Sequence, residues 1–303
     1  MAKMSTPAME RIARKNARNG GKMKASTPGR EAWKRLRRNK LAMAGMIILI
    51  ILILCAIFAP VIAPFEYDYQ DYSAVFQKPS AAHLFGTDNF GRDIFSRCIY
   101  GTRYSLPIGI CSVMISLVVG GTLGAIAAYY GGKADMLIMR FMDIYQSIPN
   151  MLLAIAVAAA IGASLRNLII AIALGSIPIY ARVVRGALLT VKQKEFIESS
   201  RAIGAGTSRQ ILRHMIPNCL GPIIVQMTFS VAAAILTASS LSFLGLGISA
   251  PAPEWGSMLN TGKQFLQTFP HMLVFPGMMI AITVLALNLF GDGLRDALDP
   301  KLK

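Results

Sequence analysis

The sequence predicts an all-α membrane protein with six transmembrane helices and a helical polar loop on the cytosolic side. Of its 303 residues 54% are hydrophobic and the mean hydropathy is +0.51, which is too apolar for an ordinary soluble protein. Charged residues make up only 15% of the chain and are concentrated in a few segments. Between these segments lie apolar runs of about 20 residues, the length that crosses ~30 Å of hydrocarbon.

Residues 1–40 form a basic tail, with 13 Lys and Arg opposed only by Glu10 and Glu31, so that it supplies +11 of the formal +16. Residues 1–29 show no apolar period and are predicted to be disordered. We expect the tail to lie on the cytosolic side against anionic lipid, at about 1 kcal/mol per basic side chain. Nucleic acid is the second choice of partner, but apart from Trp33 no aromatic residues interleave with the basic ones.

Residues 41–63 are predicted as the first transmembrane helix, because their first 19 residues carry no charge. A cleaved signal peptide is the alternative, but its apolar core normally has only about 7–15 residues. Residues 64–102 follow as a polar extracytoplasmic loop. Within this loop we expect Asp93 to cap a short helix, and Arg92 and Arg97 to pair with acidic side chains.

Residues 103–292 are predicted to form a five-helix transmembrane core that includes a loop at 190–217, followed by a cytosolic C-terminal tail at 293–303. The five spans are expected at about 105–130, 136–161, 167–189, 219–243 and 272–290. In the first of these spans, Gly120-x-x-x-Gly124 allows close approach of another helix. In the second, Pro149 should produce a kink.

Four charged residues lie near the cytosolic ends of two of these spans. Arg140 and Asp143 are three residues apart, so one helix face suits their pairing. Arg182 and Arg185 are expected within reach of Asp143, which would tie the following loop to the core. A structural role at the membrane boundary and a role in gating fit these charges equally well.

Glu195–Pro217 is a polar, basic interlude between two apolar runs, and its pattern predicts helix, glycine turn, helix. Gly204 breaks the first helix because glycine adopts backbone angles that other residues avoid. Thr207 and Gln210 have the spacing of a capping box at the start of the second helix. Pro217 marks a break before the next apolar run.

Three functions suit this loop: a solvated connection, a DNA-binding helix-turn-helix, and a docking element for a soluble partner. Its first helix should carry Phe196, Ser200 and Ile203 on one face. The DNA-binding function is poorly supported, because roughly 25 residues tethered at both ends provide no core for a recognition helix.

The spacing of Glu198, Gly204 and Pro217 resembles the loop motif of permeases in binding-protein-dependent ABC importers: Glu-Ala-Ala, three residues, Gly, nine residues, Ile-x-Leu-Pro. Two serines replace the alanines, and His214 and Ile216 stand where the family has Ile and Leu. In that family the loop forms a coupling helix that docks on the ATPase. The resemblance therefore implies coupling roles for Glu198, Arg201, Gly204, Arg209 and Pro217.

A second resemblance lies in residues 85–109, FGTDNFGRDIFSRCIYGTRYSLPIG, which look very like the signature of the dipeptide/oligopeptide/nickel permeases. The signature residues are Gly86, Asp88, Gly91, Arg92 and Asp93. Residues 250–262 and 291–303 also resemble this subfamily. The resemblance covers the chain from about residue 38 onward and implies the ABC importer permease fold, of the second-permease type.

The resemblance implies a permease subunit of an ATP-driven importer that moves di- or oligopeptides, with nickel or glutathione as alternative substrates. The implied partners are a homologous second permease, two ABC ATPases, an extracytoplasmic solute-binding protein and the lipid bilayer. ATP and Mg²⁺ would bind the ATPases, so no cofactor and no enzymatic activity are expected of this chain. The implied location is a bacterial or archaeal cell membrane, with both termini cytoplasmic. On this topology 25 basic residues lie inside and 6 outside, as the positive-inside rule requires.

Two other classes of protein remain as rivals. An ion-coupled secondary transporter would need an intramembrane coupling site, for which only Asp143 qualifies. An intramembrane enzyme would need a nucleophile with a base, or metal ligands, and the sequence contains no HExxH, GxSxG or P-loop motif. The three histidines are far apart, so we expect no metal site, and the four cysteines do not suggest a disulfide framework.

Overall fold

The computed structural model describes residues 28–298, and in this range the chain is helical, with a single β-bridge between Thr87 and Asp93. The predictions for residues 1–27 and 299–303 lie outside the described residues. Five helices are long and apolar enough to cross a membrane, or six if one bent pair counts as a single span, which confirms the all-α prediction. The single helices are α3 (Lys40–Ile57), α5 (Ile94–Tyr130), α8 (Leu165–Lys192), α12 (Leu220–Phe243) and α14 (His271–Leu298), and the bent pair is α6 (Gly132–Gln146) with α7 (Asn150–Ile161).

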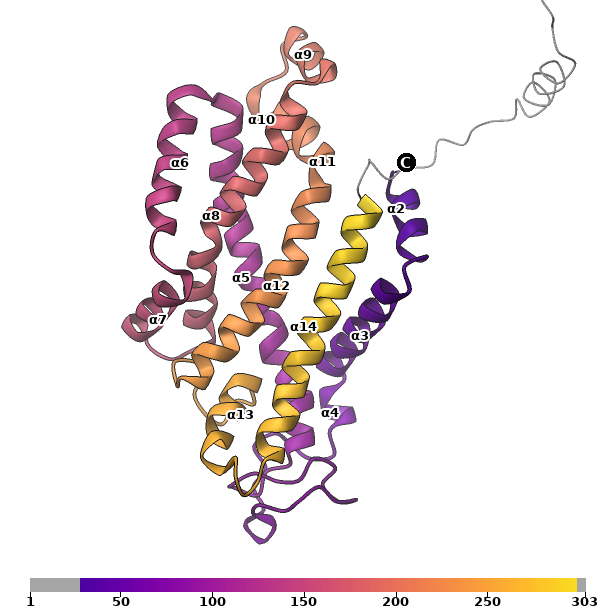
Figure 1. The fold of residues 1–303 in the computed structure, drawn as a ribbon, viewed down its shortest axis with the longest axis vertical. Coiled ribbons are helices and arrows are strands. Elements are labelled where there is room, and N and C mark those ends of the chain that lie inside the picture. Colours follow the sequence, from indigo (N-terminus) through magenta and orange to yellow (C-terminus); the bar gives the residue numbers. More distant parts are fainter. Residues whose placement is uncertain (1–27, 299–303) are drawn as a thin grey trace, which may run out of the picture.

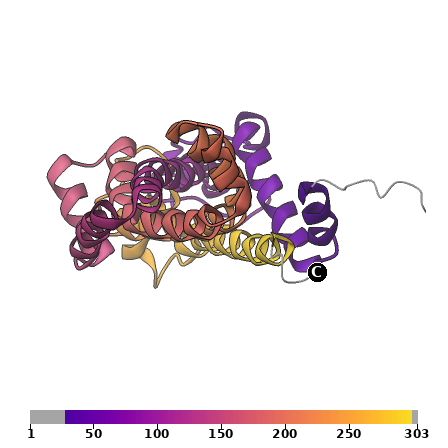
Figure 2. The same cartoon turned by 90° about the horizontal axis from the view of Figure 1, so that it is seen from above.

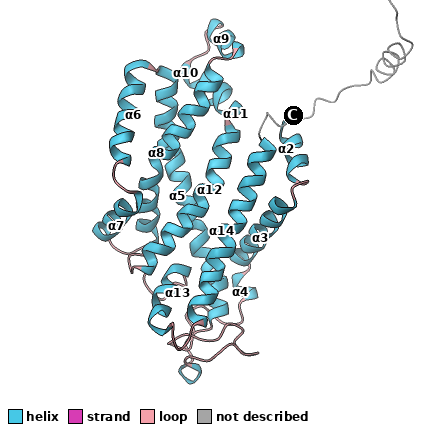
Figure 3. Ribbon diagram, in the orientation of Figure 1, coloured by secondary structure: helices cyan, strands magenta, loops and turns pink. Residues whose placement is uncertain are grey.

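The long helices run side by side along the longest axis of the molecule, and shorter elements gather at its two ends (Figure 1). One end, here called the α9 end, carries α2 (Pro28–Leu36), α9 (Glu195–Ala202), α10 (Thr207–Arg209), the π-helical η2 (Gln210–Met215) and α11 (Ile216–Asn218). The opposite α13 end carries α4 (Ala59–Ile62), η1 (Tyr72–Ala74), α13 (Trp255–Gly262) and η3 (Lys263–Phe265). The long loop after α4 lies at this end too (Figure 3). Seen from above, the bundle is elongated, with α6 and α7 at one edge and α2 and α3 at the other (Figure 2).

Helices α5 and α8 share the most extensive helix–helix interface among the described residues. A Cβ atom added to Gly120 or Gly124 would overlap backbone atoms of α8, so the approach depends on glycine at both positions. The Ser116 hydroxyl donates a hydrogen bond across the interface to the Ala173 carbonyl at 2.8 Å. The close approach that the Gly120-x-x-x-Gly124 spacing predicts is therefore present, and the two helices pack as one unit.

The loop predicted at 64–102 ends earlier than expected, because α5 begins at Ile94 and not near residue 103. Asp93 is its N-cap, as predicted, and accepts a hydrogen bond from the Ser96 N–H at 2.7 Å. The helix is not short, however, since it continues without interruption into the span. Its first turns contain polar residues that are unusual for a membrane segment. These residues are buried against protein, with Ser96 fully buried and Arg97 5% exposed.

Helices α6 and α7 are bent by 78° at a short break. Pro149 stands immediately before α7, with φ −55° and ψ 128°, which is outside the helical region. Proline supplies no N–H to the preceding turn, so the helix stops and restarts here. The kink predicted at Pro149 is therefore a complete break of the span.

Candidate functional site

The polar loop between α8 and α12 folds as predicted into helix, glycine turn and helix, and Glu195–Pro217 is called the α9 segment below. Gly204 ends α9 with φ +78°, in the left-handed region that favours glycine. The Gly204 N–H donates to the Arg201 carbonyl at 3.0 Å, and the Ala205 N–H donates to the Ser200 carbonyl at 3.1 Å. These two bonds form a Schellman motif, which satisfies the last carbonyls of the helix.

The α9 segment is anchored by only a few buried side chains. Ile197 is 1% exposed and Met215 is fully buried, and both pack in an apolar cluster with residues of α5 and α8. Phe196 and Ile203, predicted to lie with Ser200 on the face opposite the water-facing charged residues, are 40% and 85% exposed. That prediction was wrong for these two residues, because the helix rests on Ile197 and turns its other apolar side chains outward.

The second half of the α9 segment is tied to the end of α5. The Gln210 amide donates to the Ala205 carbonyl at 2.7 Å, and its oxygen accepts from the Tyr129 hydroxyl at 3.2 Å. The predicted capping box is absent, since Gly206 is the N-cap and Thr207 already lies in α10. Gln210 therefore links the glycine turn to α5 and does not close a helix end.

Lys192, the last residue of α8, makes a second connection to α5. Its ammonium group donates to the carbonyls of Ala128 at 2.9 Å and Tyr129 at 2.7 Å, in the last turn of that helix. Positive charge at a helix C-terminus is favourable because unsatisfied carbonyls point there. The ends of α5 and α8 are thus joined where the α9 segment begins.

The five residues singled out from the sequence lie on the exposed surface of the α9 segment, which projects beyond the bundle (Figure 1). They are Glu198, Arg201, Gly204, Arg209 and Pro217. A shallow depression beside α9 is lined by Glu198 and Arg201 together with Lys192 and Gln193 of the preceding helix end. The surface thus combines basic side chains with exposed apolar ones, including Leu212 at 65% exposure.

The four charged residues predicted near this end form two separate arrangements. Arg182 reaches Asp143, with 2.7 Å between Nη2 and Oδ1. Arg185 does not reach Asp143 but pairs with Asp135, at 2.6 Å between Nη2 and Oδ2, because Asp135 lies in the first turn of α6. Arg140 is exposed and makes no ion pair within the described range. Both ion pairs fasten α6 to α8.

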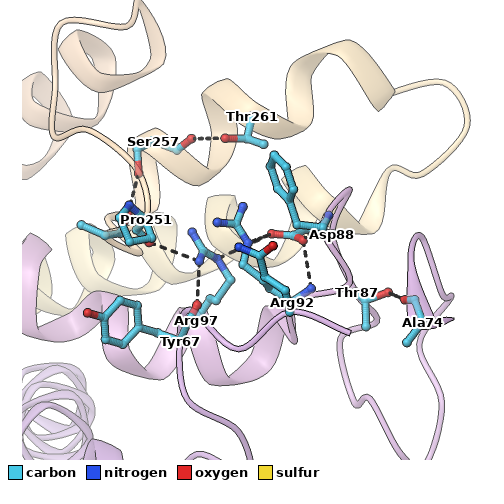
Figure 4. A network of polar contacts seen from close by, with 12 residues as sticks. Tyr67, Ala74, Thr87, Asp88, Arg92, Arg97, Pro251, Ser257 and Thr261 are labelled. Atoms are coloured by element: carbon cyan, nitrogen blue, oxygen red, sulfur yellow. Dashed lines mark hydrogen bonds and ion pairs between the residues drawn. The ribbon is translucent and has the colours of Figure 1, made fainter. Parts of the chain in front are cut away.

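A buried charge cluster lies at the α13 end (Figure 4). The Asp88 carboxylate accepts from Arg92 Nε at 2.7 Å and lies 3.8 Å from Arg97 Nε. Arg97 also donates through Nη1 to the carbonyls of Tyr67 at 2.7 Å and Pro251 at 3.3 Å. The cluster thereby joins the long loop, α5 and the segment that leads into α13.

The remaining signature residues shape the loop that presents these charges. Gly86 and Gly91 have φ values of +76° and +70°, and a Cβ on Gly91 would overlap the backbone of Asp71. Asp93 caps α5 and also lies 3.0 Å from His83 Nδ1. The structure thus brings Gly86, Asp88, Gly91, Arg92 and Asp93 together in one compact fold of the loop.

Glu254 and Trp255 were not singled out from the sequence, although both are completely buried. The Glu254 carboxylate accepts from the N–H groups of Gly256 at 2.9 Å and Ser257 at 2.8 Å, and so caps α13. Burial raises the pKa of Glu254, while these backbone bonds oppose the shift. Trp255 donates to the Cys98 carbonyl at 3.0 Å. The sequence signal that could have predicted this cap is an acidic residue directly before an apolar helical run.

The structure places no group of three His, Cys, Asp or Glu side chains at metal-binding distance anywhere in residues 28–298.

Residues 120–303 match the model of the family described as "Binding-protein-dependent transport system inner membrane component". Residues 27–79 match the "N-terminal TM domain of oligopeptide transport permease C". The chain is 50% identical over 279 residues, 92% of each chain, to the dipeptide transport system permease protein DppC of Alkalihalophilus pseudofirmus. It is 47% identical over 278 residues to the glutathione transport system permease protein GsiD of Pectobacterium atrosepticum, covering 91% of this chain and 92% of that protein.

Among solved structures, the fold is similar to that of the inward-facing MetNI methionine ABC transporter. The TM-score is 0.56 at 19% identity, and the match covers 68% of this chain and 98% of that one. This similarity concerns the fold. The family is shown by the two family matches and by the relatives that align over more than 90% of the chain. The chain belongs to the family of binding-protein-dependent transport system inner membrane components and is a permease subunit of an ABC importer.

Proposed function

We propose that this chain is one of two permease subunits in an importer of di- or oligopeptides, which an extracytoplasmic solute-binding protein delivers. A relative named as a dipeptide permease is 50% identical over almost the full length, which supports the peptide class. The relatives named as glutathione permeases are 47% to 49% identical, and glutathione is itself a modified tripeptide. Glutathione, as these relatives suggest, and nickel complexes are the alternative cargoes within the same subfamily.

The observation that carries the proposal is the exposed apolar and basic surface of the α9 segment. Ile203 at 85% exposure, Leu212 at 65% and Phe196 at 40% lie beside the exposed arginines at 201 and 209. Large apolar side chains gathered on a protruding segment indicate an interaction site, since isolated proteins seldom leave them in water. A groove on one of the two ABC ATPases is the partner that we propose for this surface.

The proposed orientation places the α9 end in the cytoplasm, with both termini on that side. Helix α2 lies at the same end as the α9 segment (Figure 1), and it brings Arg30, Lys34 and Arg35 there, with Arg37 directly after it. Basic residues next to spans are retained on the cytoplasmic side. The α13 end, with its ordered loop, would then face the solute-binding protein.

The mechanism that we propose is alternating access driven by the partner ATPases. ATP, bound with Mg²⁺ in those subunits, closes the pair and displaces the α9 segment. The displacement passes to α5 through the Tyr129–Gln210 hydrogen bond and the contacts of Lys192. Hydrolysis resets the transporter. Shifting a two-state equilibrium from about 1:99 to 99:1 requires ~5.5 kcal/mol of differential binding between the two states.

An ion-coupled secondary transporter is the rival function, and Asp143 is the residue on which it would depend. Asp143 is 52% exposed and is paired with Arg182, which suits a structural ion pair at the membrane boundary better than a buried carrier site. Uptake that depends on ATP but not on a proton or sodium gradient would separate the two functions.

The proposal is tested by affinity purification of the chain from membranes in mild detergent. We expect two P-loop ATPases and a second permease to co-purify. Ile203→Glu should release the ATPases without loss of folded protein, because the side chain is 85% exposed. Leu84→Glu is the control, because Leu84 is likewise an exposed apolar residue but lies at the α13 end. This variant should retain the ATPases. Recovery of the chain alone, with uptake along an ion gradient, would contradict the proposal.

A further inference from the structure

The charge cluster at the α13 end holds more positive than negative charge. Arg92 and Arg97 are only 4% and 5% exposed, and both face the single carboxylate of Asp88. Two buried guanidinium groups against one carboxylate leave an excess of one positive charge. Burying an uncompensated charge is costly, so a site of this kind is incomplete without an anion.

The other acidic groups near the cluster do not supply that anion. Asp93 is engaged by His83 and by the N–H of Ser96 at the start of α5. Both oxygens of Glu254 accept backbone N–H groups at the start of α13. Asp68 is exposed to solvent and makes no ion pair with either arginine within the described range. Within the described residues, Asp88 therefore supplies the only carboxylate in ion-pair contact with the two arginines, and Asp68 acts on Arg97 only from a longer distance.

A cavity of about 220 Å³ opens beside these arginines. Both side chains line it, together with Asn260 and Thr261 of α13 and the loop that joins α12 to α13. Figure 4 shows the two arginines below α13, on which Thr261 lies, with its hydroxyl donating to the Ser257 carbonyl at 3.1 Å. Within the described residues, the Arg92 guanidinium lies over the Phe90 ring at 4.7 Å, but its terminal nitrogens and the side-chain amide of Asn260 have no hydrogen-bond partner. The cavity therefore presents unused donors beside the excess charge.

We propose that this cavity binds the free carboxylate of a small solute, held by Arg92 with help from Asn260. The terminal nitrogens of a guanidinium form a fork that matches a carboxylate in two parallel hydrogen bonds. Resting on the proposed function, the solute is a peptide and the group is its C-terminal carboxylate. The site would receive the peptide as it leaves the solute-binding protein.

Burial favours a small solute over the surface of a docked protein. Since both arginines are at least 95% buried, a flat protein surface would not reach their terminal nitrogens, whereas a small molecule entering the cavity would. The volume of about 220 Å³ is below the ~300–1,000 Å³ of typical ligand pockets, which suits one end of a small peptide.

The test uses the assembled permease pair with its ATPases in detergent, without the solute-binding protein. The probes are the dipeptide Ala-Ala and its C-terminal amide, and the measurement is the rise in melting temperature with probe concentration. We expect Ala-Ala to bind about tenfold or more tightly than the amide, because charge-assisted bonds contribute about 1.5–3 kcal/mol. Arg92→Gln should abolish the difference, and Arg166→Gln, at an exposed arginine elsewhere, should preserve it.

Equal binding of the acid and the amide, or an unchanged preference in Arg92→Gln, would overturn the site. If Arg92→Gln fails to fold, Asn260→Leu is the second variant to be measured. It should weaken the binding of Ala-Ala and leave the binding of the amide unchanged. A preference seen only when the solute-binding protein is present would assign the cavity to that protein and also overturn the proposal. Uptake of labelled Ala-Ala is measured separately: normal uptake without a carboxylate preference removes this site alone, whereas absence of any peptide uptake removes the proposed function.

Discussion

The two ends of the molecule are built in opposite ways. At the α13 end, charged side chains are buried and paired, and aromatic rings stack between distant segments, with Phe76 against Phe269 at 4.4 Å and Phe85 against Phe275 at 3.9 Å. At the α9 end, large apolar side chains such as Ile203 face solvent. The α13 end is thus held by buried ion pairs and stacked rings, whereas the α9 segment rests on only a few buried side chains.

The same contrast appears in the ion pairs. The side chains of Asp88 and Arg92 are 8% and 5% exposed, while those of Asp143 and Arg182 are 52% and 41% exposed. Breaking a buried pair leaves an uncompensated charge without water, whereas an exposed pair is replaced by solvent at little cost. Similar N–O distances of 2.7 Å therefore conceal very different contributions to stability.

The largest effect is expected from Asp88→Ala, which leaves two buried guanidinium groups without a carboxylate. We expect a loss of about 3–5 kcal/mol, and ~0–1 kcal/mol for Asp143→Ala at the exposed pair. Melting temperatures of the detergent-solubilised protein measure both. Similar shifts in melting temperature for the two variants would show that the buried ion pair does not stabilise the protein more than the exposed one.

The second-largest effect is expected from Gly204→Val. The left-handed backbone at φ +78° is strained by about 1–3 kcal/mol for a branched residue, although nothing lies near enough to clash with a Cβ. We expect the glycine turn to reshape and transport to be abolished, while the protein still inserts into the membrane. Uptake assays with quantification of membrane-inserted protein check this, and Gly186→Ala, on an uncrowded helical glycine, is the control. Normal uptake by Gly204→Val would contradict the coupling role of the turn.

A smaller effect is expected from Tyr129→Phe, which removes the hydrogen bond to Gln210 and leaves the aromatic packing in place. The cost should be ~0.5–1.5 kcal/mol. Because this bond links α5 to the α9 segment, we expect peptide-stimulated ATP hydrolysis to fall more than thermal stability does. A proportionate change in both would indicate that the bond only supports the fold.

The smallest effect is a pH dependence at Glu254. Since burial raises its pKa, the folded protein binds this proton more tightly than the unfolded chain. Its stabilising contribution is fully present below the ordinary pKa of 4.5 and is lost as pH rises through the raised value. Glu254→Gln lacks this contribution, so the melting temperature of wild type relative to the variant should decrease as pH increases. A difference that does not vary with pH would refute the shift.

Much of the fold could be predicted from local pattern, because hydropathy marks spans and because capping and glycine turns depend on neighbouring residues. The cap at Asp93 and the turn at Gly204 are of this kind. Features that depend on distant contacts could not be predicted. The partner of Arg185, for example, is decided by how α6 returns beside α8, which places Asp135 and not Asp143 in reach.

The exposed face of α9 was misjudged for a different reason. A periodic apolar pattern indicates which residues avoid water but not whether the chain itself or another protein covers them. Phe196 and Ile203 are turned outward in the isolated chain. The burial of Glu254 was missed because acidic residues are rarely buried completely, and only the geometry of the α13 start shows why this one is.

Helix α5 connects the α13 end of the molecule directly to the α9 end. Its 37 residues correspond to a rod of about 55 Å, with Arg97 of the charge cluster near its start and Tyr129 near its end. If the rod tilts by about 5° around one end, the other end moves by about 5 Å. Because glycines allow α5 to pack closely against α8, we expect the two helices to move together. A displacement of a few ångströms at the α9 end, where we propose that the ATPases dock, would then be enough to change the walls of the distant cavity.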